Sequence, residues 1–427
     1  MDRDPEIENE LPEQQRRNVA HNGLRLVLAS TLQSSGDQTV KASTVLPWLF
    51  HALGVPAALT GLLVPIRESG SMLPQAFLTP LILKYRRRKW VFIIGALIQA
   101  FSAAVMAATA VWGSGLAAGI IILAALTVFS LGRSLGSITS KDIQGRTIPK
   151  GERGQINGLS TTASGLVVIT LGLAIRYFGG DDLSGGQIAW LLAGGALMWV
   201  AVAVVYAGIR EPIEDETSAP ARGENWFAAM IRLLREDRPF RKFVFARSLL
   251  LVSALSPPFI VTMAAQSGTD TLAGLGGYII ASGVAALIGG RIFGKWADKS
   301  SKGLMTIGSA AASITIIVLV AIVALPGFTG EASWQPLVFV LAYFILTLIH
   351  TGVRVARKTY VVDMAEGDMR TTYVAVSNSA MGLILLIVGA LSSALAALGI
   401  TWALLFLAAM GLLGSLTSAR LPGVSRG

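Results

Sequence analysis

Apolar segments long enough to cross a membrane recur along the whole chain and alternate with short polar connections. A helix needs about 20 mostly apolar residues to span the hydrocarbon core of a bilayer. The chain contains twelve segments of this kind, centred near Leu32, Met72, Phe101, Leu126, Val168, Leu197, Val252, Ala285, Ile314, Ile345, Leu386 and Leu407. The pattern therefore predicts an all-α membrane protein with twelve transmembrane helices.

The longest polar interruption, residues 210–242, divides the predicted helices into two sets of six. Its second part, "WFAAMIRLLRED", places Trp226, Met230 and Leu233 on one helical face. We expect an amphipathic helix on the cytoplasmic membrane surface, but a helix packed between two domains would show the same pattern. The predicted organisation is a tail, a six-helix bundle, a linker, a second six-helix bundle and a tail, at residues 1–23, 24–209, 210–242, 243–418 and 419–427.

The two predicted bundles resemble each other in detail. In the fourth and tenth segments an Arg is followed nine residues later by an Asp, as Arg133 and Asp142 and as Arg354 and Asp363. Each segment leads into a loop with a Gly, an acid and a base, "KGERGQ" around Arg153 and "EGDMRT" around Arg370. Several matches in one register indicate an internal repeat, and parallel six-helix repeats are typical of a common transporter architecture.

Composition narrows the class of protein. Hydrophobic residues make up 53% of the chain and charged residues 14%, which excludes an ordinary soluble domain. The chain has no cysteine, so disulfides and thiolate metal sites are excluded, and its three histidines give little basis for a soft-metal site. No nucleophile triad, phosphate loop or metal-spaced cluster occurs, so we predict neither enzyme activity nor a cofactor.

The net charge of +10 follows the predicted topology. Lys and Arg gather in alternate connections, as in "KYRRRK", whereas the opposite connections, such as "WGSG" and "GGDDLSGG", contain none. The positive-inside rule then places both termini in the cytoplasm of a multi-pass inner-membrane protein. Because topology accounts for the charge, we expect no nucleic-acid partner, and we expect a monomer in the lipid bilayer.

Several charged residues lie inside the predicted spans. A charge at the bilayer centre costs at least about 2.5–3.5 kcal/mol, so such residues usually face a cavity or a partner. Asp37 and Lys41 are four residues apart and should share one face of the first helix. The other charges of this kind lie in the second, fourth and tenth segments: Arg67, Glu68, Arg133, Arg354 and Arg357.

Two interpretations of these charges stay open. In the structural one, Asp37 pairs with Arg133 or Arg67, and Glu68 pairs with Lys41, as buried bridges within the first bundle. In the functional one the bridges are breakable, and Asp37 or Glu68 takes up a proton that releases its basic partner. Access to water and nearby cations both change the protonation of a carboxylate, so the second interpretation is a mechanism for proton coupling.

Bases outnumber acids among these deep residues, which favours an anionic substrate. Arg suits a carboxylate or phosphate because its planar fork binds two oxygens. The predicted substrate-binding residues are Asp37, Lys41, Arg67, Arg133, Arg354 and Arg357.

The segment "GKWADKSSK", between the eighth and ninth predicted helices, resembles the cytoplasmic signature of the major facilitator superfamily. "LGRSLGS", with Arg133, resembles the fourth-helix motif of that family that is linked to proton coupling. The matching loop of the first bundle departs from the signature, because Thr79 and Leu83 stand at its Gly and Asp positions. The resemblance implies alternating access between two halves, with Arg133 in proton coupling and with gating at Gly294, Asp298 and Lys302. The intramembrane charges add Asp37 and Glu68 to the predicted proton-coupling residues, and the internal repeat adds Asp142, Arg153, Asp363 and Arg370 to the predicted gating residues.

The sequence thus predicts a bacterial secondary active transporter, coupled to protons, for a small organic anion. A drug/proton antiporter for amphipathic compounds would instead rely on Asp37 or Glu68 in an aromatic-lined cavity. A divalent-metal exporter and a non-transporting membrane sensor on the same fold are further alternatives.

Overall fold

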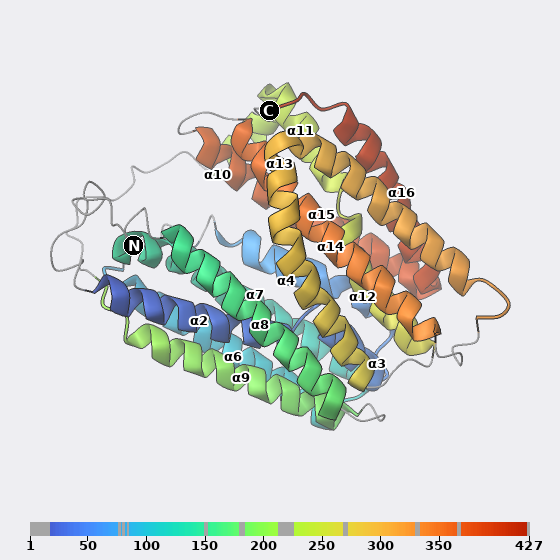
Figure 1. Ribbon diagram of the computed structural model, residues 1–427, viewed down its shortest axis with the longest axis horizontal. Coiled ribbons are helices and arrows are strands. Elements are labelled where there is room, and N and C mark those ends of the chain that lie inside the picture. Colours follow the sequence, from blue (N-terminus) through green and yellow to red (C-terminus); the bar gives the residue numbers. More distant parts are fainter. Residues whose placement is uncertain are drawn as a thin grey trace.

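The computed structural model describes residues 18–424 apart from short gaps at residues 76–77, 79–81, 83–84, 149–152, 179–183, 212–225, 268–271, 329–333 and 365–368. All regular secondary structure in the described part is helical, as the sequence predicts. Figure 1 shows the helices gathered into two groups, one from each half of the chain.

The first group runs from α2 to α9. Its helices are α2 (Val19–Thr39), α3 (Val45–Ala52), the short 3₁₀ helix η2 (Ala57–Leu59), α4 (Thr60–Met72), α6 (Arg88–Trp112), α7 (Gly115–Thr147), α8 (Arg153–Phe178) and α9 (Gly185–Ala207). Within it, α6 packs on α7 and α9, α2 packs on α8 and α9, and α4 packs on α7. Gly95 and Gly132 allow α6 and α7 to cross closely, since a Cβ on Gly95 would lie 2.6 Å from the Gly132 carbonyl oxygen.

The second group follows the linker helix α10 (Trp226–Glu236). It contains α11 (Arg238–Leu249), α12 (Val252–Gln266), α13 (Leu272–Val323), α14 (Gln335–Asp363), α15 (Met369–Leu398) and α16 (Ile400–Ala419). Ser300 has non-helical backbone angles and divides α13 into two helices. α13 packs on α14 and α16, and α14 also packs on α12.

The two groups meet through α8 with α13, α4 with α15 and α12, and α3 with α12. Figure 1 shows them close together where α3, α12 and the start of α13 lie, and farther apart toward the chain ends marked N and C. The interface is therefore tight at one end of the molecule.

One helix in each group is interrupted at a related place. α2 ends at Thr39 and α3 begins at Val45, whereas α11 ends at Leu249 and α12 begins at Val252. In the first break Pro47 lacks an N–H, and its ring would clash with the Ser43 carbonyl in a continuous helix. The expectation that Lys41 continues the helical face of Asp37 is wrong, because Lys41 lies in the turn between α2 and α3.

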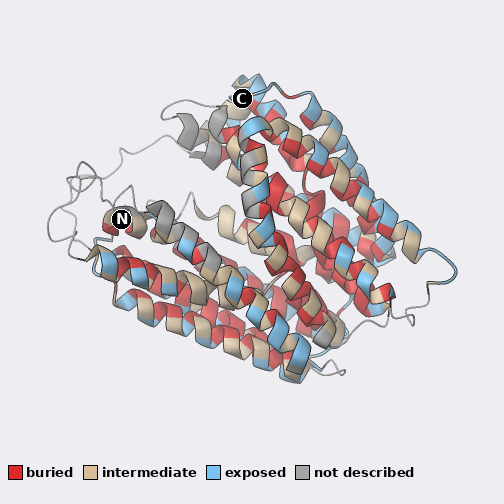
Figure 2. Cartoon of the chain, viewed as in Figure 1, coloured by how far each residue is buried: buried red, intermediate tan, exposed pale blue. Residues whose placement is uncertain are grey.

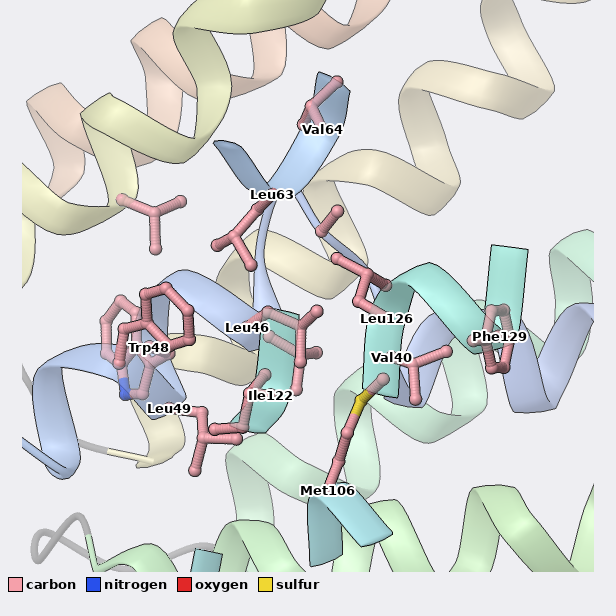
Figure 3. Close-up of a cluster of buried hydrophobic side chains, with 14 of the residues drawn as sticks. Val40, Leu46, Trp48, Leu49, Leu63, Val64, Met106, Ile122, Leu126 and Phe129 are labelled. Carbon is pink, nitrogen blue, oxygen red and sulfur yellow. The ribbon is translucent and has the colours of Figure 1, made fainter. Parts of the chain in front are cut away.

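Apolar packing fixes the first break in position. Val40, Leu46 and Trp48 are fully buried, and Figure 3 shows this segment packed against Ile122 and Leu126 of α7. The Lys41 carbonyl accepts the N–H groups of Thr44 and Leu46, at 3.2 and 3.1 Å, so the turn satisfies part of its own backbone.

Eight helices in the described residues are long and apolar enough to cross a membrane, which makes the chain a multi-pass membrane protein. The count of twelve is not confirmed, since α2, α3 and α4 fall outside that criterion and α8 and the start of α13 contribute only shorter apolar stretches. Figure 2 shows buried residues where helices pack and exposed residues on outward faces. Large side chains on those faces, such as Phe101 and Leu197, are apolar, as contact with lipid requires.

Candidate functional site

Asp37 is shared by two arginines in the first half of the chain. Its Oδ1 accepts a hydrogen bond from Nη2 of Arg67 on α4 at 2.9 Å, and its Oδ2 accepts one from Nη1 of Arg133 on α7. The sequence predicts that Asp37 pairs with Arg133 or with Arg67, and in the structure it pairs with both. Because α2, α4 and α7 each supply one member, the three ionic side chains tie these helices together.

The three side chains are only partly shielded from water. Their exposed fractions are 17% for Asp37, 12% for Arg67 and 31% for Arg133. Arg67 also lies over the Phe129 ring, with its guanidinium carbon 5.0 Å from the ring centroid, and its Nη1 is buried without a hydrogen-bond partner. One carboxylate between two guanidiniums leaves a net positive charge and a spare donor.

Glu68 follows Arg67 on α4 and lies within electrostatic range of Arg133 and of Arg357 on α14. The bridge expected between Glu68 and Lys41 does not occur among the ion pairs of the described residues. Glu68 is therefore a half-buried carboxylate that faces cations from both halves of the chain without a close ion pair in that set.

The second half adds a cluster of bases on α14. Arg354 and Lys358 are exposed, whereas Arg357 is buried, so Arg357 lies on a different side of α14 from the other two bases. His350 lies 3.4 Å from the Ser253 hydroxyl through its Nδ1, and Lys41 is close enough to act on it electrostatically. Bases of both halves therefore approach one another across the interface.

Arg247, on α11, is a member of this cluster that the sequence reading missed. It is buried, and it lies within electrostatic range of Arg357. Arg247 closely follows Arg238, Arg241 and Lys242, so the sequence alone assigns it to the basic cytoplasmic connection. The one available signal was the apolar residues on either side of it, "FVFARSLLL".

The expected gating residues are only partly described. Asp142 is paired within the first half, with Arg88 on α6 and, at 2.7 Å, with Nε of Arg146 on α7. Lys302 is half-buried in the second part of α13, and its carbonyl accepts the Thr306 hydroxyl. The remaining gating positions lie outside the residues whose side chains the structure describes: Gly294, Asp298, Arg153, Asp363 and Arg370.

Three buried aromatic residues close the tight end of the interface. The Thr44 hydroxyl and the Tyr343 hydroxyl are 2.7 Å apart, which joins the first break to α14. The Trp48 ring packs on Tyr278, with centroids 5.5 Å apart, and Tyr278 packs edge-on against Tyr343 at 5.1 Å. Side chains from both halves thus pack against one another at this end.

No group of three or more His, Asp or Glu residues suited to a metal ion occurs among the described residues. What the described side chains offer at the interface is a positively charged region with two carboxylates, open to partial hydration. Such a region can attract an anion, and its carboxylates can exchange protons.

Solved structures with the same fold are transporters. The nucleoside transporter NupG, in a variant form, superimposes with a TM-score of 0.72 and 13% identity, covering 93% of this chain and 99% of that one. A D-xylose-proton symporter gives 0.70 and 13% over 95% and 98% of the two chains. A variant of the peptide transporter POT gives 0.71 and 12% over 93% of each. These identities establish the shared fold only.

No curated protein sequence matches the chain. The family model of the Major Facilitator Superfamily matches residues 26–329, which is more than half of the chain and includes the ion-paired Asp37 site. The helical architecture, the multiple membrane spans and the family match agree, and the chain belongs to the Major Facilitator Superfamily of transporters.

Proposed function

We propose that the protein is a proton-coupled secondary transporter for a small organic anion and works by alternating access. The observation that carries this proposal is the excess of buried and half-buried bases at the interface. The carboxylates Asp37 and Glu68 are outnumbered by five buried or half-buried bases, Lys41, Arg67, Arg133, Arg247 and Arg357, and the exposed Arg354 lies close to this set. Uncompensated charge inside a membrane protein is costly, so an anionic solute is the ligand that this region accommodates best.

The helices group into twelve spans if each interrupted pair counts once. On this proposal α2 with α3 and α11 with α12 each form one broken span, and the two parts of α13 form two spans. The linker that contains α10 then joins two six-helix bundles, as the sequence suggests. Breaks in corresponding spans of the two bundles support the internal repeat.

The basic connections support an orientation in which both chain termini lie on the cytoplasmic side of the inner membrane. On that orientation the end sealed by Trp48, Tyr278 and Tyr343 is the external one. The structure then corresponds to a state in which the interface opens toward the cytoplasm, and transport requires the seal to part while the opposite end closes.

Glu68 is the better candidate for the proton carrier, and Asp37 for the structural counter-ion. Protonation of Asp37 would disrupt its ion pairs with Arg67 and Arg133 together. Protonation of Glu68 breaks no ion pair among the described residues and changes the field acting on Arg133 and Arg357. Proton binding at Glu68 is thus linked electrostatically to the arginines of both halves.

Thermal unfolding of the detergent-solubilised protein against a panel of ligands tests the substrate class. The panel contains organic anions, lipophilic cations and divalent metals at two pH values, and a ligand that binds the native state raises the apparent stability. We expect stabilisation by a subset of the anions. Stabilisation by lipophilic cations alone would favour a drug/proton antiporter, and stabilisation by metals alone would favour a metal exporter.

A further inference from the structure

Two arginines of the second half are buried without an ion pair among the described residues. Arg247 on α11 and Arg357 on α14 are 8% and 7% exposed, and both lie within segments long and apolar enough to span the membrane. Side chains of this kind are rarely buried unless they are paired. Their burial therefore calls for a compensating group.

The hydrogen bonds of Arg247 do not supply a negative charge. Its Nη1 donates to the Ser377 hydroxyl at 2.7 Å and its Nη2 donates to Oδ1 of Asn378 at 3.0 Å, both on α15. These neutral acceptors orient the guanidinium, but its Nε is buried with no partner. Arg247 is thus held in position with one donor unused.

Arg357 has no hydrogen-bond partner for its buried Nε or for its buried Nη1. The charged groups that act on it most are Arg247 and Arg354, which repel it, and Glu68 of the other half, which attracts it. An unsatisfied buried donor and an unpaired buried charge are both unfavourable. Together these facts leave the buried Arg357 guanidinium with two unused donors and with no negative charge in direct contact with it among the described residues.

We propose that Arg357 and Arg247 form an oxyanion subsite that takes a carboxylate or phosphoryl group, with Glu68 as the opposing carboxylate when the subsite is empty. Guanidinium groups match such ligands because each presents several fixed donors to two or more oxygens, whereas a halide offers a single acceptor. Ser377 and Asn378 position Arg247 for this role. The inference rests on the proposed anion transport and assigns the anionic end of the solute to the second half of the chain.

The subsite is tested by thermal unfolding of the full-length protein in a neutral detergent, with inorganic phosphate, succinate and chloride at equal ionic strength. We expect phosphate or succinate to raise the Tm, and the concentration required to increase at least 10-fold in Arg357→Gln and in Arg247→Gln. Arg238→Gln is the matched control, since Arg238 is exposed on the same helix as Arg247. Its response should equal that of the wild type.

The ligand-free Arg357→Gln protein should be as stable as the wild type, because the substitution removes repulsion from Arg247 and Arg354. Arg357→Lys keeps the positive charge but loses the planar guanidinium group with its several fixed donors. Its Tm should rise less with oxyanions than that of the wild type, and it should still elute as a folded protein in size-exclusion chromatography. An equal rise in Tm with chloride would overturn the assignment to oxyanions. A rise with vesicles of anionic phospholipid and with neither soluble oxyanion would overturn the assignment to a solute.

The subsite and the proposed function fail in different ways. Undiminished oxyanion responses in Arg357→Gln and Arg247→Gln would overturn the subsite and leave anion transport standing. If no anion of the wider panel stabilised the wild type, the proposed function itself would be wrong.

Discussion

At the scale of single residues, Asp37 is the counter-ion of two arginines in the first half. It accepts hydrogen bonds from Arg67 and Arg133, which come from different helices. Removing one partner from a buried ionic group costs more than the net contribution of the group, because the remaining charges lose their compensation. Asp37 is therefore required for stability whatever else it does in transport.

Asp37→Asn should lower the stability of the protein by about 1–3 kcal/mol, since it leaves two partly buried arginines without a counter-ion. The measurement is unfolding of the purified protein in detergent, with Glu236→Gln as an exposed control expected to change little. In the double variant Asp37→Asn with Arg133→Gln, the loss of stability should be smaller than the sum of the losses in the two single variants. The reason is that both substitutions break the same Asp37–Arg133 interaction. Fully additive losses would contradict the shared bridge.

At the scale of elements, apolar segment length was sufficient to predict that the chain is helical and crosses the membrane several times. It was not sufficient to predict the breaks, because hydropathy averages over a window longer than the turn at Lys41. The prolines were an incomplete guide as well. Pro47 follows the first break closely, but Pro257 and Pro258 lie inside α12, several residues after the second break at Leu250 and Leu251.

The charged side chains show the same limit of the sequence. The ion pairs of Asp37 could be predicted as one of two interpretations, because a buried acid needs a base nearby. Arg247 was missed because a basic residue near a basic loop looks exposed when only the sequence is considered. Its burial depends on packing against α15, where Ser377 and Asn378 accept its hydrogen bonds, and no local sequence pattern records that contact.

The crossing of α6 and α7 gives a prediction at this scale. Gly95→Val should destabilise the protein by about 1–3 kcal/mol, since its Cβ would stand 2.6 Å from the Gly132 carbonyl and force the helices apart. Gly194→Ala is the matched control, because nothing lies within 4 Å of a Cβ at that helical position. It should be neutral or slightly stabilising. A stable Gly95→Val protein would contradict the close crossing.

At the scale of the whole molecule, the halves are joined at the sealed end by the hydrogen bond between Thr44 and Tyr343. Tyr343→Phe should remove that bond and keep the ring, which weakens the seal by about 0.5–1.5 kcal/mol. The population should then shift toward states in which this end is open. Tyr206→Phe is the control, because Tyr206 packs within the first half against Phe92.

Spin-label distances measure this shift directly. The chain has no cysteine, so labels react only where a cysteine is introduced, and the exposed positions Trp112 and Leu398 place one label on each half. Tyr343→Phe should add a longer-distance population between them, and Tyr206→Phe should not. An unchanged distribution in Tyr343→Phe would show that the hydrogen bond does not hold the halves together.

Proton movement through Glu68 is the most direct test of the central claim. Proteoliposomes that contain the purified protein and a pH-sensitive dye would be exposed to inward gradients of the organic anions that stabilise it. We predict that at least one anion gradient drives proton flux through the wild type and through Glu236→Gln, whereas Glu68→Gln carries none. Equal proton flux in Glu68→Gln, or no flux with any stabilising anion, would contradict a proton-coupled anion transporter.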